Sequence, residues 1–245
     1  MKILGVIGGL GPMATAYFVQ LVTQMTDAVT DQEHIEMIIH SKPSIPDRTK
    51  YILGLSKDNP LPLLLSVEDS LIEQGANIIA IPCITAHFFQ PELEKDGIEV
   101  VHAIRETALY LNEEKITKIG VMATDGTIQS KLFQQILGEY NIECIVPSES
   151  KQKMVMSLIY NDVKAGKEPD MEEFNQIREE LKNNGAQIVL LGCTELSLIK
   201  KDYKVGKDIL DVMEVMARHV VLRCGQLKNE YTPVSYTHLT LPTKR

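Results

Sequence analysis

Two of the four cysteines lie in segments that repeat one pattern. The segment GANIIAIPCITAHF begins at Gly75 and carries Cys83, and GAQIVLLGCTELSL begins at Gly185 and carries Cys193. In both segments an apolar run ends at the cysteine and a helix-like stretch follows. Each thiol is therefore expected at the C-terminal end of a strand and the N-terminal end of a helix. Open α/β sheets bind their ligands at that edge.

The expected position of the two thiols also predicts their reactivity. A helix N-terminus stabilises anions. The pKa of a cysteine thiol, about 8.5 when the residue is free, can therefore be lowered there by a unit or more. The alternative is a buried structural cysteine, which is common. For Cys144 and Cys224 that structural interpretation is adopted. For Cys83 and Cys193 the shared context favours two thiols on opposite sides of one small substrate.

Polar residues follow both cysteines closely. Thr85 comes two residues after Cys83, and Thr194 comes directly after Cys193. A threonine here can cap the helix or bond a ligand carboxylate, and the two roles are compatible. Glu195 and His87 lie in the next turn, where each is either a helix-start residue or a member of the site.

The elements that carry these residues alternate between short β-branched runs and longer amphipathic stretches. Such alternation predicts βαβ units and a parallel sheet. In the first part of the chain the pattern predicts strands at 2–8, 34–41 and 77–82, helices at 12–29 and 61–76, and a loop at 41–54.

The pattern then restarts, which indicates two related halves. Gly5-Val6 recurs as Gly120-Val121, and the two cysteine segments recur at a similar offset. The repeat predicts an α/β protein of two pseudo-symmetric Rossmann-like or flavodoxin-like halves with parallel sheets and the active site in the cleft between them. The expected boundaries are 1–98 plus 207–233 for the first half, with a final helix near 208–228 returning to it, and 99–206 for the second. The last residues, 234–245, continue no pattern and are predicted to be a non-native tail.

Composition and charge exclude several classes of function. The 245 residues are 44% hydrophobic and 24% charged, with a formal net charge of −8 and no basic run. These values argue against nucleic acid as a partner. No apolar run is long enough to cross a membrane, and the first residues fit a buried strand better than a signal peptide, so the expected location is the cytoplasm. No cysteine pair has the C-x-x-C spacing of a zinc site, and no metal is expected. A homodimer is expected because symmetric dimers are the commonest homo-oligomers.

The glycines near the N-terminus offer a competing interpretation. GLGPMA, from Gly9 to Ala14, fits the dinucleotide fingerprint G-x-G-x-x-A. That fingerprint needs an acidic residue at the end of the second strand, but this strand ends IIHSKP. A dehydrogenase is therefore rejected. The glycines are expected to let the backbone approach a small ligand or pack tightly.

Four motifs together resemble the aspartate/glutamate racemase family over nearly all of residues 1–230. They are GVIGGLGP, IPDRT, PCITAH and LGCTEL. The resemblance implies an amino-acid racemase that uses no pyridoxal phosphate or other cofactor, with Cys83 and Cys193 facing each other across a small anionic amino acid. It implies that Arg48 and Lys164 assist binding and catalysis. It further implies a substrate pocket that includes Gly9, Met13, Thr85, Thr124, Thr127, Thr194 and Glu195.

The implied chemistry is consistent with elementary requirements. Racemisation without an electron sink needs a dry pocket, donors aimed at the carboxylate, and one base for each face of the substrate. One sulfur must be a thiolate and the other a thiol, so the pair should titrate as a coupled unit and give a bell-shaped pH profile. Arg48 offers a planar fork for a carboxylate.

One departure from the family pattern keeps alternatives open. The family usually reads Pro-Cys-Asn-Thr, whereas this chain has Ile84 in place of the asparagine. The alternatives are a cysteine-dependent isomerase or racemase of another small acid, such as maleate or a hydantoin, and a non-catalytic amino-acid-binding protein. IPDRT favours the amino-dicarboxylate branch. Aspartate and glutamate differ by one methylene, worth about 1–3 kcal/mol in a pocket, so the sequence does not choose between them.

Overall fold

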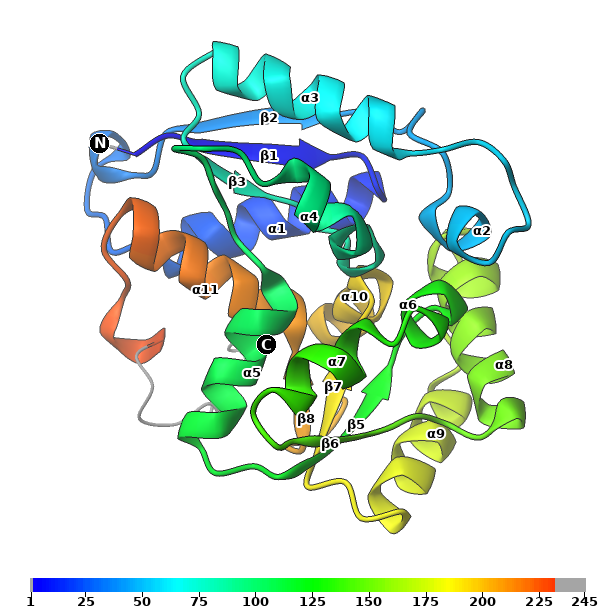
Figure 1. Ribbon diagram of the computed structural model, residues 1–245. Coiled ribbons are helices and arrows are strands. Elements are labelled where there is room, and N and C mark those ends of the chain that lie inside the picture. Colours follow the sequence, from blue (N-terminus) through cyan, green and yellow to red (C-terminus); the bar gives the residue numbers. More distant parts are fainter. Residues whose placement is uncertain (1, 232–245) are drawn as a thin grey trace.

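Two parallel four-stranded sheets with the same strand order form the framework of the protein (Figure 1). The structure, a computed structural model, describes residues 2–231. The predicted tail at 234–245 lies outside the described residues. The first sheet has the order β2-β1-β3-β4 and the second the order β6-β5-β7-β8. Their strands are β1 (Leu4–Gly8), β2 (Met37–Ser41), β3 (Ile78–Ala80), β4 (Glu99–Val100), β5 (Lys118–Met122), β6 (Glu143–Ile145), β7 (Ile188–Leu191) and β8 (Ile209–Asp211).

Helices connect and cover these strands. Up to residue 98 they are α1 (Pro12–Met25), the 3₁₀ helix η1 (Asp31–Glu33), α2 (Arg48–Ile52), α3 (Leu61–Glu73), the 3₁₀ helix η2 (Ile84–Phe89) and α4 (Gln90–Leu93). From residue 99 to 206 they are α5 (Ala103–Glu113), α6 (Asp125–Gln129), α7 (Leu132–Gly138), α8 (Glu149–Ser157), the π-helix η3 (Leu158–Val163), α9 (Met171–Asn183) and α10 (Thr194–Asp202), and α11 (Val212–Cys224) and the 3₁₀ helix η4 (Asn229–Tyr231) follow. No described helix has the length and apolar character that crossing a membrane requires.

The predicted fold class is confirmed. In each half the first strand lies in the middle of its sheet, β1 between β2 and β3, and β5 between β6 and β7. Strand pairing draws the limits of the two sheets slightly differently from the predicted boundaries. Glu99–Val100 pairs with β3 of the first sheet, and Ile209–Asp211 pairs with β7 of the second.

Several elements differ from their predicted ranges, each for a local reason. The predicted loop at 41–54 contains α2, because the Asp47 carboxylate accepts a hydrogen bond from the backbone N–H of Lys50 and caps the helix. The predicted helix at 12–29 ends at Met25, where the Thr26 hydroxyl bonds the carbonyl of Val22. The predicted helix at 61–76 ends at Glu73, and Gly75 follows with φ of +102°.

The last helix joins the two halves. Figure 1 shows α3 and α1 on opposite sides of the first sheet, with α11 between α1 and α5. α11 also contacts β3 of the first sheet and β7 of the second. One buried apolar cluster includes side chains from both sheets, such as Val6 and Val121, together with Met216 of α11. Two further clusters belong to one half each.

Candidate active site

The two repeated cysteines line one small cavity between the halves. Cys83 follows β3 and Cys193 follows β7, and each is the extended residue directly before a helix. Their exposed fractions are only 6% and 5%. The cavity has a volume of about 10 Å³, the room of about one water molecule. We call it the inner chamber. Its lining is Leu10, Asp47, Arg48, Thr49, Cys83, Ile84, Thr85, Thr124, Tyr160, Lys164, Cys193, Thr194 and Glu195.

Three threonine hydroxyls form a closed triangle beside the thiols. The oxygen of Thr85 lies 3.0 Å from those of Thr124 and Thr127, which lie 3.1 Å from each other. All three are buried. Thr124 caps α6, since its hydroxyl also accepts from the backbone N–H of Thr127. Because Thr85 comes from the first half and the others from the second, the triangle is a polar contact between the halves.

Arg48 is held in place by backbone carbonyls. Its Nη1 donates to Pro46 at 2.9 Å and Ile45 at 3.3 Å, and its Nη2 donates to Leu10 at 3.2 Å. The side chain is 8% exposed, and its buried Nε has no partner. Burial opposes its charge, but the nearby Cys83 and Asp47 raise its pKa above the ordinary value. Arg48 is thus a fixed cation whose Nε–H has no hydrogen-bond partner in the described part of the chain.

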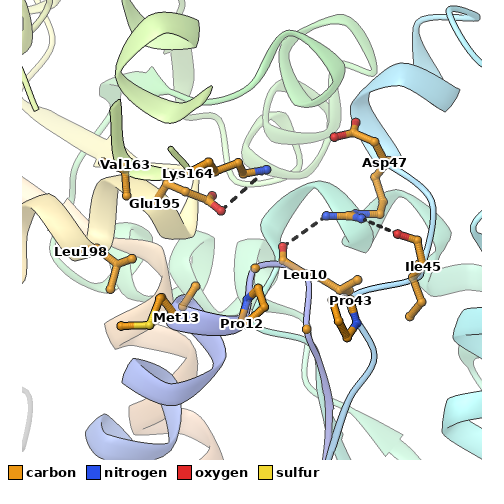
Figure 2. A pocket seen from close by; sticks show the side chains of 14 residues that line it. Leu10, Pro12, Met13, Pro43, Ile45, Asp47, Val163, Lys164, Glu195 and Leu198 are labelled. Carbon is orange, nitrogen blue, oxygen red and sulfur yellow. Dashed lines mark hydrogen bonds and ion pairs between the residues drawn. The ribbon is translucent and has the colours of Figure 1, made fainter. Parts of the chain in front are cut away.

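Lys164 lies opposite, beside Glu195. Its Nζ is 3.7 Å from Glu195 Oε1 and 4.4 Å from the centre of the Tyr160 ring. Figure 2 shows Lys164 and Glu195 side by side, with the ion pair between them drawn as a dashed line. Burial works against the charge of Lys164, but Glu195 and Cys193 raise its pKa above the ordinary value. The second cation of the site is therefore also permanently charged at neutral pH.

The Cys193 thiol donates a hydrogen bond to Glu195 Oε2 at 2.9 Å. Burial, and next the Glu195 charge, raise the pKa of Cys193 well above its usual value. The sequence predicted a lowered pKa from the helix N-terminus, and for this thiol that prediction is wrong. Desolvation and an adjacent carboxylate outweigh the first turn of α10.

A larger outer pocket of about 420 Å³ adjoins the inner chamber and shares Leu10, Asp47, Arg48, Lys164 and Glu195 with it. Two residues of the predicted pocket, Gly9 and Met13, line this outer pocket and not the inner chamber. Met13 is 68% exposed, and Figure 2 shows it near Leu198 on the wall below Lys164. Gly9 has φ of +90°, and a Cβ there would lie 2.5 Å from the backbone of Lys42, so tight packing requires this glycine.

The other predicted site residues gather as follows. Arg48, Lys164, Thr85, Thr124, Thr194 and Glu195 line the inner chamber with the two cysteines. Thr127 lies one hydrogen bond behind them. His87 turns away, with its Nδ1 2.7 Å from Gln90 Oε1. Burial raises the pKa of Cys144 to about 12 and is the first cause that raises the pKa of Cys224 to about 11.

Sequence reasoning missed three polar residues of the chamber, Asp47, Thr49 and Tyr160. Tyr160 donates from its hydroxyl to Asp47 Oδ2 at 3.2 Å, which links η3 of the second half to the start of α2 in the first. Burial raises the pKa of Tyr160 to about 12, so the hydroxyl remains a donor. Asp47 stands in the quoted IPDRT motif, where only the arginine attracted notice. Tyr160 precedes Lys164 by one helical turn, and that spacing was its only signal.

The candidate site is thus a pair of buried thiols in a polar chamber between two α/β halves, flanked by two cations. The sequence profile described as Asp/Glu/Hydantoin racemase matches residues 7–220. The chain belongs to this family, and it is an isomerase that racemises amino acids.

Individual relatives agree with the family. The chain is 25% identical to the broad specificity amino-acid racemase RacX of Bacillus subtilis (strain 168) over 89% of this chain and 96% of that protein. It superposes on the Picrophilus torridus aspartate racemase with a TM-score of 0.81 and 29% identity, covering 95% of this chain and 99% of that one. The glutamate racemase of Francisella tularensis subsp. tularensis SCHU S4 in complex with D-glutamate gives a TM-score of 0.66 at 18% identity over 91% and 80% of the chains, a likeness of fold alone.

Proposed function

We propose that this racemase interconverts the enantiomers of aspartate, or of glutamate, by proton transfer at Cα between Cys83 and Cys193. The observation that carries the proposal is the two repeated thiols in one chamber, each at the end of the equivalent strand of its half. One sulfur, as thiolate, removes the α-proton from one face. The other, as thiol, returns a proton to the opposite face, so no group has to move around the substrate.

The charges around the thiols suit an acidic amino acid. Arg48 and Lys164 are two fixed cations, which match two carboxylates. The free Nε of Arg48 offers a donor to a carboxylate whose charge grows as the carbanion forms. The cavity volume of about 10 Å³ is too small for an amino acid, so the chamber must widen toward the outer pocket to admit one.

Ile84 favours a second candidate class of substrate, the uncharged amino acids. Its side chain is buried and lines the inner chamber at the position where the family usually has asparagine. An apolar side chain there offers no hydrogen bond to a substrate ammonium or carboxylate group. The name of the Bacillus subtilis relative, a broad specificity racemase, also supports a wider range of amino acids.

The test is α-proton exchange in D₂O under reducing conditions, followed by NMR at Cα and by chiral chromatography. L-aspartate, L-glutamate and a panel of uncharged L-amino acids would be compared. We expect exchange with inversion for an acidic amino acid. Cys83→Ala and Cys193→Ala should each reduce inversion by about 10²–10⁴-fold, the range for loss of one acid–base group. Cys144→Ala, outside the chamber, is the matched control. Exchange with uncharged amino acids alone would refute the acidic substrate and support the second substrate class.

The expected homodimer also remains a proposal, and light scattering of the purified protein tests it. The cytoplasmic location stays a prediction. All four cysteines are free thiols in the structure, as a reducing environment requires.

A further inference from the structure

The residue four positions after each chamber cysteine is a buried polar side chain. His87 follows Cys83 at this distance and lies in η2, and Ser197 follows Cys193 at the same distance and lies in α10. His87 is 1% exposed and Ser197 is completely buried, and neither side chain lines the inner chamber. The two halves therefore repeat a buried polar position behind the thiol, about one helical turn further along the chain.

Ser197 connects α10 to the last strand of the second sheet. Its hydroxyl donates to Asp211 Oδ1 at 2.7 Å, and Asp211 is the last residue of β8. The same oxygen accepts a hydrogen bond from the backbone N–H of Met213 at 2.9 Å and so caps α11. Asp211 is completely buried, so water does not compete for these bonds. The first turn of α10 is thus fixed to β8 and α11 through one carboxylate oxygen.

His87 makes the corresponding connection in the first half through Gln90. Its Nδ1 lies 2.7 Å from Gln90 Oε1, and Gln90 Nε2 donates to the carbonyl of Val100 at 3.1 Å. Because the amide nitrogen of Gln90 is used by Val100, its oxygen accepts and the imidazole Nδ1–H donates. Val100 is the last residue of β4, the strand that takes the place of β8 in the first sheet. Burial lowers the pKa of His87 to about 4, so this arrangement of a neutral ring persists at neutral pH.

Both connections are polar at positions where an apolar side chain would satisfy packing alone. Burial of a hydroxyl or an imidazole costs free energy unless a hydrogen bond compensates for it. A hydrogen bond is also directional, so it fixes a helix relative to a strand more narrowly than apolar contacts do. The two halves use different side chains, but they make the connection at the same place relative to the thiol and to the same strand of the sheet. The shared feature is therefore the connection, and its repeated place links it to the thiols.

We propose that His87 and Ser197 are positioning residues that hold the two thiols on opposite faces of the substrate. This inference rests on the proposed two-cysteine reaction. Each side chain ties the turn after its cysteine to the fourth strand of its own sheet, and the strand before the cysteine, β3 or β7, pairs with that same fourth strand. The thiol is thus held from both sides along the chain. Loss of one connection should free the thiol of that half and leave the other thiol in place.

Site-resolved alkylation measures the freedom of each thiol without any turnover. The reduced protein is pulsed with iodoacetamide at one fixed pH, and mass spectrometry of the peptides gives a rate for Cys83 and a rate for Cys193. In Ser197→Ala the Cys193 rate should rise about tenfold, the change in a local opening equilibrium when a buried hydrogen bond is lost, while the Cys83 rate changes less than about twofold. His87→Leu should give the reverse pattern, with the rise at Cys83.

Two further variants separate positioning from general stability. Thr107→Val removes a buried hydroxyl that bonds a carbonyl of its own helix α5, so it should destabilise the protein without a selective effect on either thiol. Asp211→Asn keeps an oxygen that accepts the hydrogen bond of Ser197, so it should keep the Cys193 rate close to that of the unmodified protein. Melting temperatures verify that every variant is folded.

Steady-state kinetics supply a second readout for Ser197→Ala. A base displaced from the reacting carbon slows the chemical step, whereas the groups that bind the substrate stay in place. We therefore expect kcat to fall about tenfold or more and KM to change less than about twofold.

Each outcome has a defined meaning. The proposal is overturned if the Cys193 rate rises no more in Ser197→Ala than in Thr107→Val, or if both thiols become equally reactive. A Cys193 rate in Asp211→Asn as high as in Ser197→Ala would contradict a connection through this hydrogen bond. If His87→Leu does not fold, Ser197→Ala decides alone. Alkylation does not depend on racemisation, so an absence of α-proton exchange would refute the proposed function and leave this result readable.

Discussion

The hydroxyls of Thr85, Thr124 and Thr127 satisfy one another at distances of 3.0–3.1 Å. Each oxygen is buried, so the loss of one hydroxyl leaves its partners short of a hydrogen bond that water cannot replace. One member of the triangle, Thr85, is also the hydroxyl-bearing chamber residue that is nearest in sequence to Cys83.

Thr85→Val removes one corner of this triangle without a change of shape. We expect a loss of about 1–3 kcal/mol in the free energy of unfolding, since two buried hydroxyls lose a partner, and a fall in racemisation. Thr107→Val is the control, because that buried hydroxyl bonds only the carbonyl of Ala103 within α5. Urea unfolding and racemase assays of both variants make the comparison. Equal activity losses in the two variants would show that the triangle has no special part in catalysis.

For individual residues, the sequence predicted a role in the site where the residue belongs to a local motif. The two cysteines and their threonines could be predicted because each pair follows a strand within a few residues. Tyr160 could not, because its role depends on Asp47, 113 positions away. The pKa of Cys193 could not either, because burial is set by the packing of both halves around the thiol.

At the scale of elements, the chamber is closed by two short segments from different halves. α2 carries Arg48, and the π-helix η3 carries Tyr160, a helix type that occurs often at functional sites. α2 also packs tightly on α6, because a Cβ at Gly126 would lie 2.8 Å from the Thr49 Cα. The hydrogen bond from Tyr160 to Asp47 joins these segments at the wall of the chamber that the thiols also line.

Tyr160→Phe removes that hydrogen bond and keeps the ring against which Lys164 packs. A hydrogen bond to a charged group contributes about 1.5–3 kcal/mol, so we expect kcat/KM to fall by about tenfold or more as the closed chamber loses stability. Tyr160→Leu, which also removes the ring, should lower kcat/KM further. Tyr140→Phe, at a half-buried tyrosine outside the chamber, is the control. Steady-state kinetics with wild-type rates in Tyr160→Phe would contradict the closing role.

Two buried histidines, one of them in the helix η2 that follows Cys83, should make the stability of the protein depend on pH. His87 of η2 stacks on His102 before α5 with ring centres 5.2 Å apart. Burial lowers the pKa of His87 from 6.5 to about 4, and burial, with the charges of His87 and Arg105, lowers that of His102 to about 3. The folded protein keeps both rings neutral where the unfolded chain takes up protons. Their contribution is therefore complete above pH 6.5 and decreases as the pH falls toward 4.

His87→Asn removes one of these titrations. The unmodified protein should lose about 2 kcal/mol between pH 7.5 and pH 5 through His87 alone, and this part of the loss should be absent in the variant. Urea unfolding at the two pH values measures the difference. Thr107→Val, a neutral change in α5, should be destabilised equally at both pH values. The same pH dependence in His87→Asn as in the unmodified protein would refute the assignment.

Long periodic elements such as α1 and α3 were the easiest to predict, whereas the short strands β4 and β8 were missed. α1 and α3 appeared in the sequence pattern with only their ends misplaced. The strands β4 and β8 have two and three residues, and pairing with a neighbouring strand alone makes them strands. The segment after Cys83 was predicted to be helix-like, but its 3₁₀ form was not.

At the scale of the whole molecule, two repeated halves share one core. Gly5 of β1 packs against Leu71 of α3, and Gly120 of β5 packs against Leu181 of α9, so the two sheets repeat even in this glycine–leucine contact. Each leucine belongs to the apolar cluster of its own half. The largest cluster, however, combines both sheets with α11, whose contacts with α1 and α5 bridge them. The repeat in the sequence therefore indicates the architecture of the halves but not their mutual dependence.

Because the shared cluster lies between the halves, we expect them to unfold as one unit. Leu71→Ala and Leu181→Ala should each lower the free energy of unfolding by about 2–5 kcal/mol, the range for a buried leucine. Native-state hydrogen exchange is the measurement, because amides of central strands exchange through global opening. Each variant should reduce the protection of β1 and β5 by the same amount, although Leu71 touches only the first half and Leu181 only the second. If Leu181→Ala weakens β5 and spares β1, the halves are separate folding units, and the chamber between them depends on docking. Equal losses in both strands would mean that any destabilising change in one half also loosens the chamber wall formed by the other.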